Sequence, residues 1–243
     1  MCGRYTNTPT LPQLVAALDE ALDVPGSPDV YERFNVAPTQ DVLAVVADRH
    51  GRRPAALRWG LVPHWSKGPG DGPLRINARA ESAHERPAFA SLLESSRGRC
   101  LIIADGFYEW VRAEDPRRPR RPLHFALAER RPFAFAGLWT TWRPPDGGDP
   151  VRSCTILTTA ANRVVAPAHD RMPVILADPG ERAAWLDASL DAAGVAPLLR
   201  PLPDDALQAR RASARVNAAT YDAPDCLDED DPEPEPAQLS LLG

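Results

Sequence analysis

The chain has 243 residues, 44% of them hydrophobic and 25% charged, which is the composition of an ordinary soluble protein. No apolar run is long enough to span a membrane, and polar residues follow Met1 at once, so we expect a cytoplasmic protein without a membrane partner. The four cysteines are far apart, which supports neither a zinc site nor a disulfide framework. We therefore expect no metal and no cofactor.

The charge is unevenly distributed along the chain. Residues 222–243 contain eight acidic residues and no basic ones, which leaves 28 basic and 25 acidic residues and a balance of +3 in residues 1–221. Only Lys67 is a lysine, and the other basic residues are arginines, whose forked guanidinium matches phosphate oxygens. We predict one domain over residues 1–221 and an acidic, disordered tail over residues 222–243.

The first half of the chain predicts two helices and a strand pair. Thr10 is a plausible N-cap of an amphipathic helix over residues 10–22. Strands are expected over residues 42–47 and 56–61, and the Gly- and Pro-rich residues 67–73 indicate a loop. A second helix is expected over residues 87–95.

The second half predicts short strands with little helix between them. Asp105-Gly106 indicates a tight turn between two strands, and residues 114–121 indicate an exposed loop. The expected strands cover residues 100–104, 107–111, 123–128, 133–138, 153–159, 174–176 and 213–216, with short helices near residues 181–188 and 196. Many short strands without βαβ units predict a mainly antiparallel α+β domain.

Cys2 is the most reactive candidate. If Met1 is removed, Cys2 carries a thiol and a free α-amine on adjacent carbons. An α-amine has a pKa of about 7.7–8.0, against about 10.4 for lysine, so much more of it is uncharged near neutral pH. The amine can form an imine with an aldehyde, and the thiol can then close a thiazolidine ring intramolecularly. Taken alone, Cys2 is better explained as an accidental residue on a frayed terminus, so the functional interpretation depends on the residues that follow.

Further polar residues lie beside aromatic or backbone-restricting ones. Glu109 lies among aromatic residues, where desolvation should raise its pKa toward a value useful for acid–base chemistry. His169 is held between prolines, and Asn77 lies between two arginines. Each has a structural alternative: an outward-facing strand residue for Glu109, a structural histidine for His169, and a turn asparagine for Asn77. Tryptophans such as Trp59 are more often core residues than base-stacking platforms.

A set of longer motifs resolves these alternatives. MCGRY, NVAPTQ, RWGLVPHWSK, INARAES, RCLIIADGFYEW, FAGLW, ILTTAAN and HDRMPVIL follow one another over residues 2–221. In this order they resemble the SRAP (SOS response-associated peptidase) family. The resemblance implies a single compact domain whose mainly antiparallel sheets form a barrel-like core flanked by helices. It also implies that the chain traps abasic sites in single-stranded DNA as a thiazolidine crosslink in the DNA damage response.

The resemblance assigns catalytic roles by position. Cys2 matches the covalent nucleophile, and Asn77 would hold its amine or thiol. Glu109 would move protons during imine formation and ring opening, and His169 would protonate the ring oxygen of the sugar. Where the family more usually has a lysine, this chain has Val111, followed by an arginine-rich loop; we expect both departures to be peripheral.

The same resemblance assigns the DNA contacts. Phosphate contacts are expected from Arg4, Arg79 and Arg171, and Trp65 is expected to contact a neighbouring base. Pro38 and Thr158 would shape the pocket. Arginine contacts combined with aromatic stacking are how single strands are held without sequence preference. We expect a monomer, associated with the nucleoid.

The C-terminal residues suggest a partner. Gln238-Leu239-Ser240-Leu241-Leu242 is similar to the short peptide with which bacterial DNA-maintenance proteins bind the sliding clamp. Gln238 would make polar contacts, and Leu239, Leu241 and Leu242 would fill an apolar pocket. An unstructured end, or a terminus that marks the protein for proteolysis, is the alternative.

Three functions therefore remain open from the sequence. The first is covalent capture of abasic sites, with lyase or self-processing activity as possible accompaniments. The second is a cysteine peptidase, acting mainly in removal of Met1, which would need an activated thiolate and an oxyanion hole. The third is a DNA-binding module that forms no covalent bond.

Overall fold

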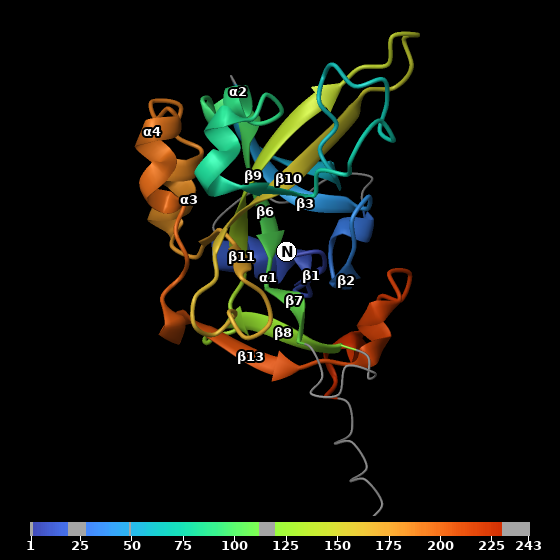
Figure 1. Ribbon diagram of the computed structural model, residues 1–243, viewed down its shortest axis with the longest axis vertical. Coiled ribbons are helices and arrows are strands. Elements are labelled where there is room, and N and C mark those ends of the chain that lie inside the picture. Colours follow the sequence, from blue (N-terminus) through green and yellow to red (C-terminus); the bar gives the residue numbers. More distant parts are fainter. Residues whose placement is uncertain (1, 19–27, 49, 112–119, 230–243) are drawn as a thin grey trace, which may run out of the picture.

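The strands form two sheets in the computed structural model, which describes residues 2–18, 28–48, 50–111 and 120–229 (Figure 1). The five-stranded sheet is antiparallel throughout, in the order β13-β8-β7-β1-β2. Its strands are β1 (Tyr5–Asn7), β2 (Arg33–Val36), β7 (Gly106–Val111), β8 (Arg121–Leu127) and β13 (Leu207–Arg211).

The eight-stranded sheet closes on itself. Its strand order is β11-β10-β4-β3-β6-β9-β12. Because β10 also pairs with β9, the five strands β10, β4, β3, β6 and β9 form a closed barrel. Only β4 and β5 pair parallel to β10. The strands are β3 (Asp41–Asp48), β4 (Gly51–Trp59), β5 (Asn77–Arg79), β6 (Arg99–Ala104), β9 (Phe133–Trp142), β10 (Val151–Ala160), β11 (Arg171–Pro173) and β12 (Ile175–Leu176). The α+β class and the barrel-like core are confirmed.

Short helices cover the outside of this barrel. They are α1 (Leu11–Leu18), α2 (Ala90–Leu93), α3 (Pro179–Trp185) and α4 (Ala192–Val195), with 3-10 turns at residues 28–30, 80–85, 96–98, 196–198, 204–206, 214–217 and 224–227. The expected helix over residues 87–95 is thus reduced to one turn, and that over residues 10–22 is seen to Leu18, beyond which residues 19–27 lie outside the described residues. No helix in the described ranges is long and apolar enough to cross a bilayer.

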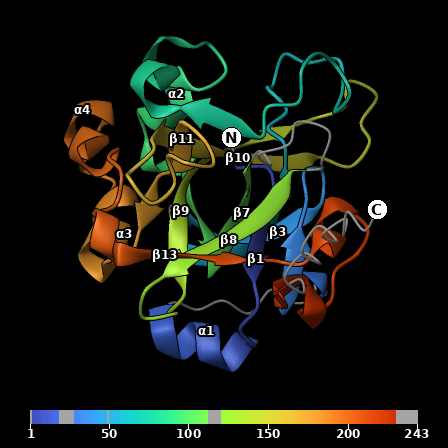
Figure 2. The same cartoon turned by 60° about the horizontal axis from the view of Figure 1, so that its bottom comes forward.

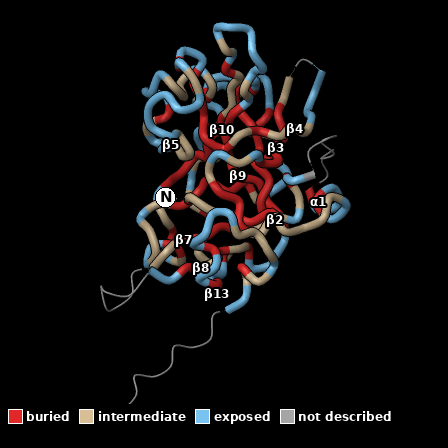
Figure 3. The backbone as a smooth tube through the Cα atoms, turned by 90° about the vertical axis from the view of Figure 1, so that its right-hand side faces the viewer, coloured by how far each residue is buried: buried red, intermediate tan, exposed pale blue. Residues whose placement is uncertain are grey.

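Successive side chains of β3 point alternately into the two main hydrophobic cores. Val42, Ala44 and Val46 belong to a core shared with the five-stranded sheet, whereas Leu43 and Val45 face the helices. A strand buried on both faces reads as a continuous apolar run, and β3 is indeed buried from Val42 to Val46. Figure 3 shows this buried interior with the exposed segments outside it.

The expected hairpin at Asp105-Gly106 is wrong. β6 pairs with β3 and β9, whereas β7 pairs with β1 and β8, so these two residues connect different sheets. Asp105 instead accepts hydrogen bonds from the backbone N–H of Thr8, at 3.2 Å, and from its hydroxyl. A Cβ on Gly106 would lie 2.1 Å from Nε2 of His124, so close packing, rather than a turn, requires glycine here.

The domain extends beyond the boundary expected at residue 221. The strand expected over residues 213–216 is a 3-10 turn, and the strand lies earlier, at β13. Residues 222–229, assigned from sequence to the disordered tail, pack against the domain: Cys226 is buried, and Asp222 accepts hydrogen bonds from the backbone N–H of Phe34 and Asn35 at 2.6 and 2.9 Å. Residues 230–243, with Gln238, Leu239, Leu241 and Leu242, lie outside the described residues.

Asp222 should therefore contribute to stability. An Asp222→Ala substitution leaves two backbone donors and the Nε of Arg33 without their acceptor, and we expect a loss of about 1–3 kcal/mol in the free energy of unfolding. Urea unfolding measures the loss. Asp228→Ala, which removes an exposed acid from the same segment, is the matched control. Equal midpoints for the two variants would contradict this role.

Candidate active site

Cys2 lies inside the protein, just before β1. Its side chain is fully buried, and its Sγ lies 3.7 Å from the carbonyl oxygen of Arg4, to which the thiol donates a weak hydrogen bond. Three residues later, Tyr5 contacts Trp59 and Phe135 edge-on in the shared core, with ring centroids 5.4 and 5.6 Å apart. The beginning of the chain is therefore anchored, which excludes the frayed terminus as an account of Cys2.

Asn77 holds the backbone of Cys2. Its Nδ2 donates to the carbonyl oxygen of Cys2 at 2.8 Å, so the contact is with the carbonyl and not with the amine or thiol that we expected. Trp59 holds the backbone directly before Asn77, because its indole N–H donates to the carbonyl oxygen of Ile76 at 2.9 Å. The Oδ1 of Asn77 is buried and has no hydrogen-bond partner among the described residues. A buried acceptor thus lies beside the start of the chain.

Glu109 provides a buried acid. It is 4% exposed on β7 and lies on the same side of that strand as Phe107, a residue of the shared core, which excludes the outward-facing alternative. Burial raises the pKa of Glu109, as its aromatic sequence context predicted. Burial, reinforced by the charge of Glu109, also raises the pKa of the Cys2 thiol. The two groups therefore lie within electrostatic reach of each other, and the thiol is protonated at neutral pH.

His169 lies at the edge of an open cavity. Its side chain is 31% exposed, its Nδ1 accepts from the backbone N–H of Arg171 at 3.0 Å, and the Asp170 carboxylate is 2.8 Å from the same nitrogen. Burial lowers the pKa of His169, so the ring is neutral near pH 7. Either ring nitrogen can carry the proton, because the Arg171 N–H favours an unprotonated Nδ1 and the Asp170 carboxylate favours a protonated one.

The cavity beside His169 has a volume of about 520 Å³ and is open to solvent. Val111 and Arg120 line it together with Trp110 and Asp170. Val111 and Arg120 therefore lie beside His169, in a cavity whose lining does not include Cys2. The run of arginines was the available signal for Arg120, whereas Asp170 offered none beyond its position next to His169. The rest of that loop, residues 112–119, lies outside the described residues.

Two of the arginines expected to contact phosphate are engaged within the protein. Arg4 donates to Oδ1 of the buried Asn35 at 3.0 Å and to the carbonyl of Val216. Arg171 forms a bidentate pair with Glu81, both distances being 2.7 Å, and donates to the carbonyl of Thr158. These contacts brace the strands around the site.

Sequence reasoning missed Glu81. The Arg171 guanidinium lowers the pKa of the Glu81 carboxyl, chiefly through this hydrogen bonding. The two residues are 90 positions apart, so no local signal links them.

The remaining predicted contacts lie nearer the surface, apart from Thr158. Arg79 is exposed at the end of β5, on the same side of the strand as Asn77, and Trp65 is 52% exposed. Pro38 is half-buried in the turn between β2 and β3. Thr158 is buried, and its hydroxyl donates to the carbonyl of Ala78 at 3.4 Å, so it supports β5 from within.

No metal centre accompanies these groups within the described residues. In the ranges that the structure covers, no three His, Cys, Asp or Glu side chains lie close enough to hold a metal ion. All four cysteines are free and buried. The site is thus built from a buried thiol, a buried carboxylic acid, an amide and a neutral imidazole.

The sequence is similar to those of known proteins. The chain belongs to the SOS response associated peptidase (SRAP) family, which it matches over residues 1–219. It is 38% identical to the abasic site processing protein YoqW of Bacillus subtilis, over 94% of this chain and 99% of that protein. It is 32% identical to the abasic site processing protein YedK of Escherichia coli, over 75% of this chain and 78% of that protein.

A solved structure agrees with the fold. A crystal structure of a protein from Bacteroides thetaiotaomicron superimposes with a TM-score of 0.80 at 20% identity, covering 94% of this chain and all of that one.

Proposed function

We propose that this protein captures abasic sites in single-stranded DNA through a covalent bond to Cys2. The observation that carries the proposal is the burial of Cys2 beside Glu109, with Asn77 bonded to its carbonyl oxygen. The names of YoqW and YedK support abasic sites as the substrate. Removal of Met1 is required, because only then does the nitrogen of Cys2 become a nucleophilic amine.

The capture proceeds in two steps on one residue. The α-amine nitrogen of Cys2 attacks the aldehyde carbon of the opened sugar, and loss of one water gives an imine. The thiol sulfur then adds to the imine carbon, the thiol proton passes to nitrogen, and a five-membered ring closes. The protonated form of His169 donates a proton to the ring oxygen as the sugar opens and is left as neutral imidazole, and Glu109 carries protons to and from the hydroxyl that leaves.

The buried thiol argues against a peptidase. A cysteine peptidase needs a thiolate, which is favoured by a nearby cation or a helix N-terminus and disfavoured by apolar burial. Burial and the neighbouring Glu109 instead raise the pKa of Cys2. Imine formation by the amine does not need a thiolate at the start, so this environment favours the aldehyde chemistry.

One assay separates the three functions. The purified protein is incubated with a single-stranded oligonucleotide carrying one abasic site, or with the undamaged oligonucleotide, and run on a denaturing gel. We expect a slower band with abasic DNA alone. Cleavage of a peptide without this band would favour the peptidase, and salt-sensitive binding without it would favour a module that binds DNA non-covalently.

We also propose that the C-terminal residues recruit the protein to the replication sliding clamp. The support is the sequence of residues 238–242 after an acidic run, a form suited to a terminal peptide that orders on binding. Deletion of residues 238–243 should abolish binding to the purified clamp and leave DNA crosslinking unchanged. Unchanged clamp affinity in surface plasmon resonance would refute this partner.

A further inference from the structure

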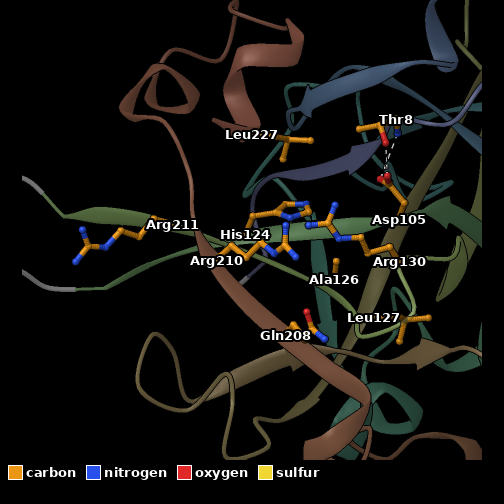
Figure 4. Close-up of a pocket in the computed structure, with 10 residues that line it drawn as sticks. All are labelled: Thr8, Asp105, His124, Ala126, Leu127, Arg130, Gln208, Arg210, Arg211 and Leu227. Atoms are coloured by element: carbon orange, nitrogen blue, oxygen red, sulfur yellow. Dashed lines mark hydrogen bonds between the residues drawn. The ribbon is translucent and has the colours of Figure 1, made fainter. Parts of the chain in front are cut away.

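A second pocket lies on the outer face of the five-stranded sheet. It has a volume of about 320 Å³, and Figure 4 shows the residues that line it. His124 of β8 points into it and hydrogen-bonds through Nε2 to the hydroxyl of Thr6 at 3.0 Å. Its neighbour Phe125 points the other way, into the core that contains Cys2. The pocket is therefore on the opposite face of the sheet from the candidate active site.

Its charge is strongly positive. Arg130, Arg210 and Arg211 line the pocket, and within the described ranges their guanidinium groups make no hydrogen bond or ion pair. The one carboxylate in the lining, Asp105, already accepts two hydrogen bonds from Thr8. Figure 4 shows Arg130 and Arg210 extending toward the His124 ring from different elements, whereas Arg211 points away.

His124 adds no charge of its own. Burial lowers its pKa to about 4, although Asp105 acts in the opposite direction, so the ring is neutral at physiological pH. Three arginines against the single carboxylate of Asp105 leave the lining with a net positive charge, which a bound anion offsets. The pocket is thus suited to an anion with several oxygen acceptors.

The backbone holds Arg130 in an unusual conformation. Its φ is 52°, in the left-handed region, and its N–H donates to the carbonyl of Leu127 at 2.9 Å. Such a conformation is unfavourable for a residue other than glycine. The adjacent carboxylate of Glu129 is bonded to Arg131 at 2.7 Å and does not neutralise Arg130.

Basic residues lie between the cavity beside His169 and this pocket. Arg120, which lines the cavity beside His169, directly precedes β8. On the neighbouring strand β13, Arg211 and Arg210 lie opposite Leu123 and His124 of β8. The distance along β8 from residue 121 to residue 126 is about 17 Å at roughly 3.3 Å per residue. An extended strand of a few nucleotides can cover it (Figure 2 shows β8 and β13 side by side).

We propose that Arg130 and Arg210 bind a phosphate group of the DNA strand as it continues beyond the lesion. The choice of DNA as the phosphate source rests on the proposed function. The forked guanidinium offers parallel donors to two phosphate oxygens, and paired arginines fix the strand by its backbone without reading its bases. The contact lengthens the footprint of the protein on DNA, while the chemistry remains at Cys2.

The test compares two double variants on undamaged single-stranded DNA of 20 and 4 nucleotides. Arg130→Ala/Arg210→Ala should weaken binding of the longer strand about tenfold and reduce the slope of log affinity against log salt by about 0.7, the value for one phosphate contact on a single strand. Binding of the 4-nucleotide strand and crosslinking yield on a short abasic strand should not change. Arg86→Ala/Arg97→Ala removes the same charge at exposed positions beside α2 and is the control.

The outcomes separate this inference from the proposed function. Equal losses in both double variants would show a general charge effect and overturn the inference, as would an unchanged salt slope. Binding of inorganic phosphate that is lost in Arg130→Ala/Arg210→Ala without any change in DNA affinity would assign the pocket to free phosphate and overturn the DNA contact. A wild-type protein that binds the longer strand through these arginines but never crosslinks would refute only the proposed function.

Discussion

A Cys2→Ser variant should form no adduct that survives denaturation, yet borohydride should still trap it on abasic DNA. The serine keeps the α-amine that forms the imine, but its hydroxyl is a far weaker nucleophile than sulfur and does not complete the ring. Reduction of the imine fixes the bond between nitrogen and carbon. Yields with and without borohydride on a denaturing gel measure the two steps separately.

Two comparisons make the Cys2 result specific. Cys226→Ser alters another buried thiol, in the packing of residues 222–229, and should crosslink like the wild type. A stable adduct in Cys2→Ser without reductant would show that sulfur is unnecessary. Loss of the borohydride-trapped product as well would show that the α-amine is not the first nucleophile.

Glu109→Gln should slow crosslinking about 100-fold or more, the usual contribution of a positioned acid–base group. Burial raises the pKa of Glu109, so it stays protonated, and able to donate, at a higher pH than an ordinary glutamate. The wild-type rate should rise with pH as the α-amine loses its proton and fall as Glu109 loses its own. Single-turnover rates between pH 5 and 9 should show that the variant lacks the falling limb.

Glu109→Gln should slow crosslinking but should stabilise the folded protein at pH 8. Because the pKa of Glu109 is higher in the folded than in the unfolded chain, its contribution is fully present below the unfolded pKa and is lost as pH rises through the folded pKa. Glutamine has no proton to lose, so the variant should become more stable relative to the wild type as the pH rises from 4 to 8. A variant that is slow because it is unstable at pH 8 would contradict the proton-transfer role.

Local sequence patterns predicted strand positions better than strand partners. Strands β3 and β6 lie where alternation and apolar runs placed them, because the burial that creates the pattern also defines the strand. Asp105-Gly106 has the local chemistry of a hairpin turn, but its flanking strands pair with partners from elsewhere in the chain. Tertiary packing decided that position, through the close contact between Gly106 and His124.

In the candidate active site, too, the sequence predicted which residues come together but not which atoms are in contact. The motifs around Cys2, Asn77 and Glu109 named residues that the fold places around one buried thiol. The atoms in contact were not predictable: Asn77 bonds to a carbonyl oxygen, and Arg4 reaches Val216, 212 positions away in sequence. Both contacts join segments that are far apart in the sequence and meet only in the folded chain.

The joint action of the Cys2 α-amine and thiol is tested most directly by changing what precedes Cys2. Two forms of the protein are prepared, one beginning at Cys2 and one with a Gly-Ser extension before it, and their N-termini are verified by intact mass. After incubation with abasic single-stranded DNA, the first should gain the mass of the oligonucleotide less one water, and the extended form should gain none. An extended form that gives the same adduct at the same rate would contradict the aminothiol mechanism.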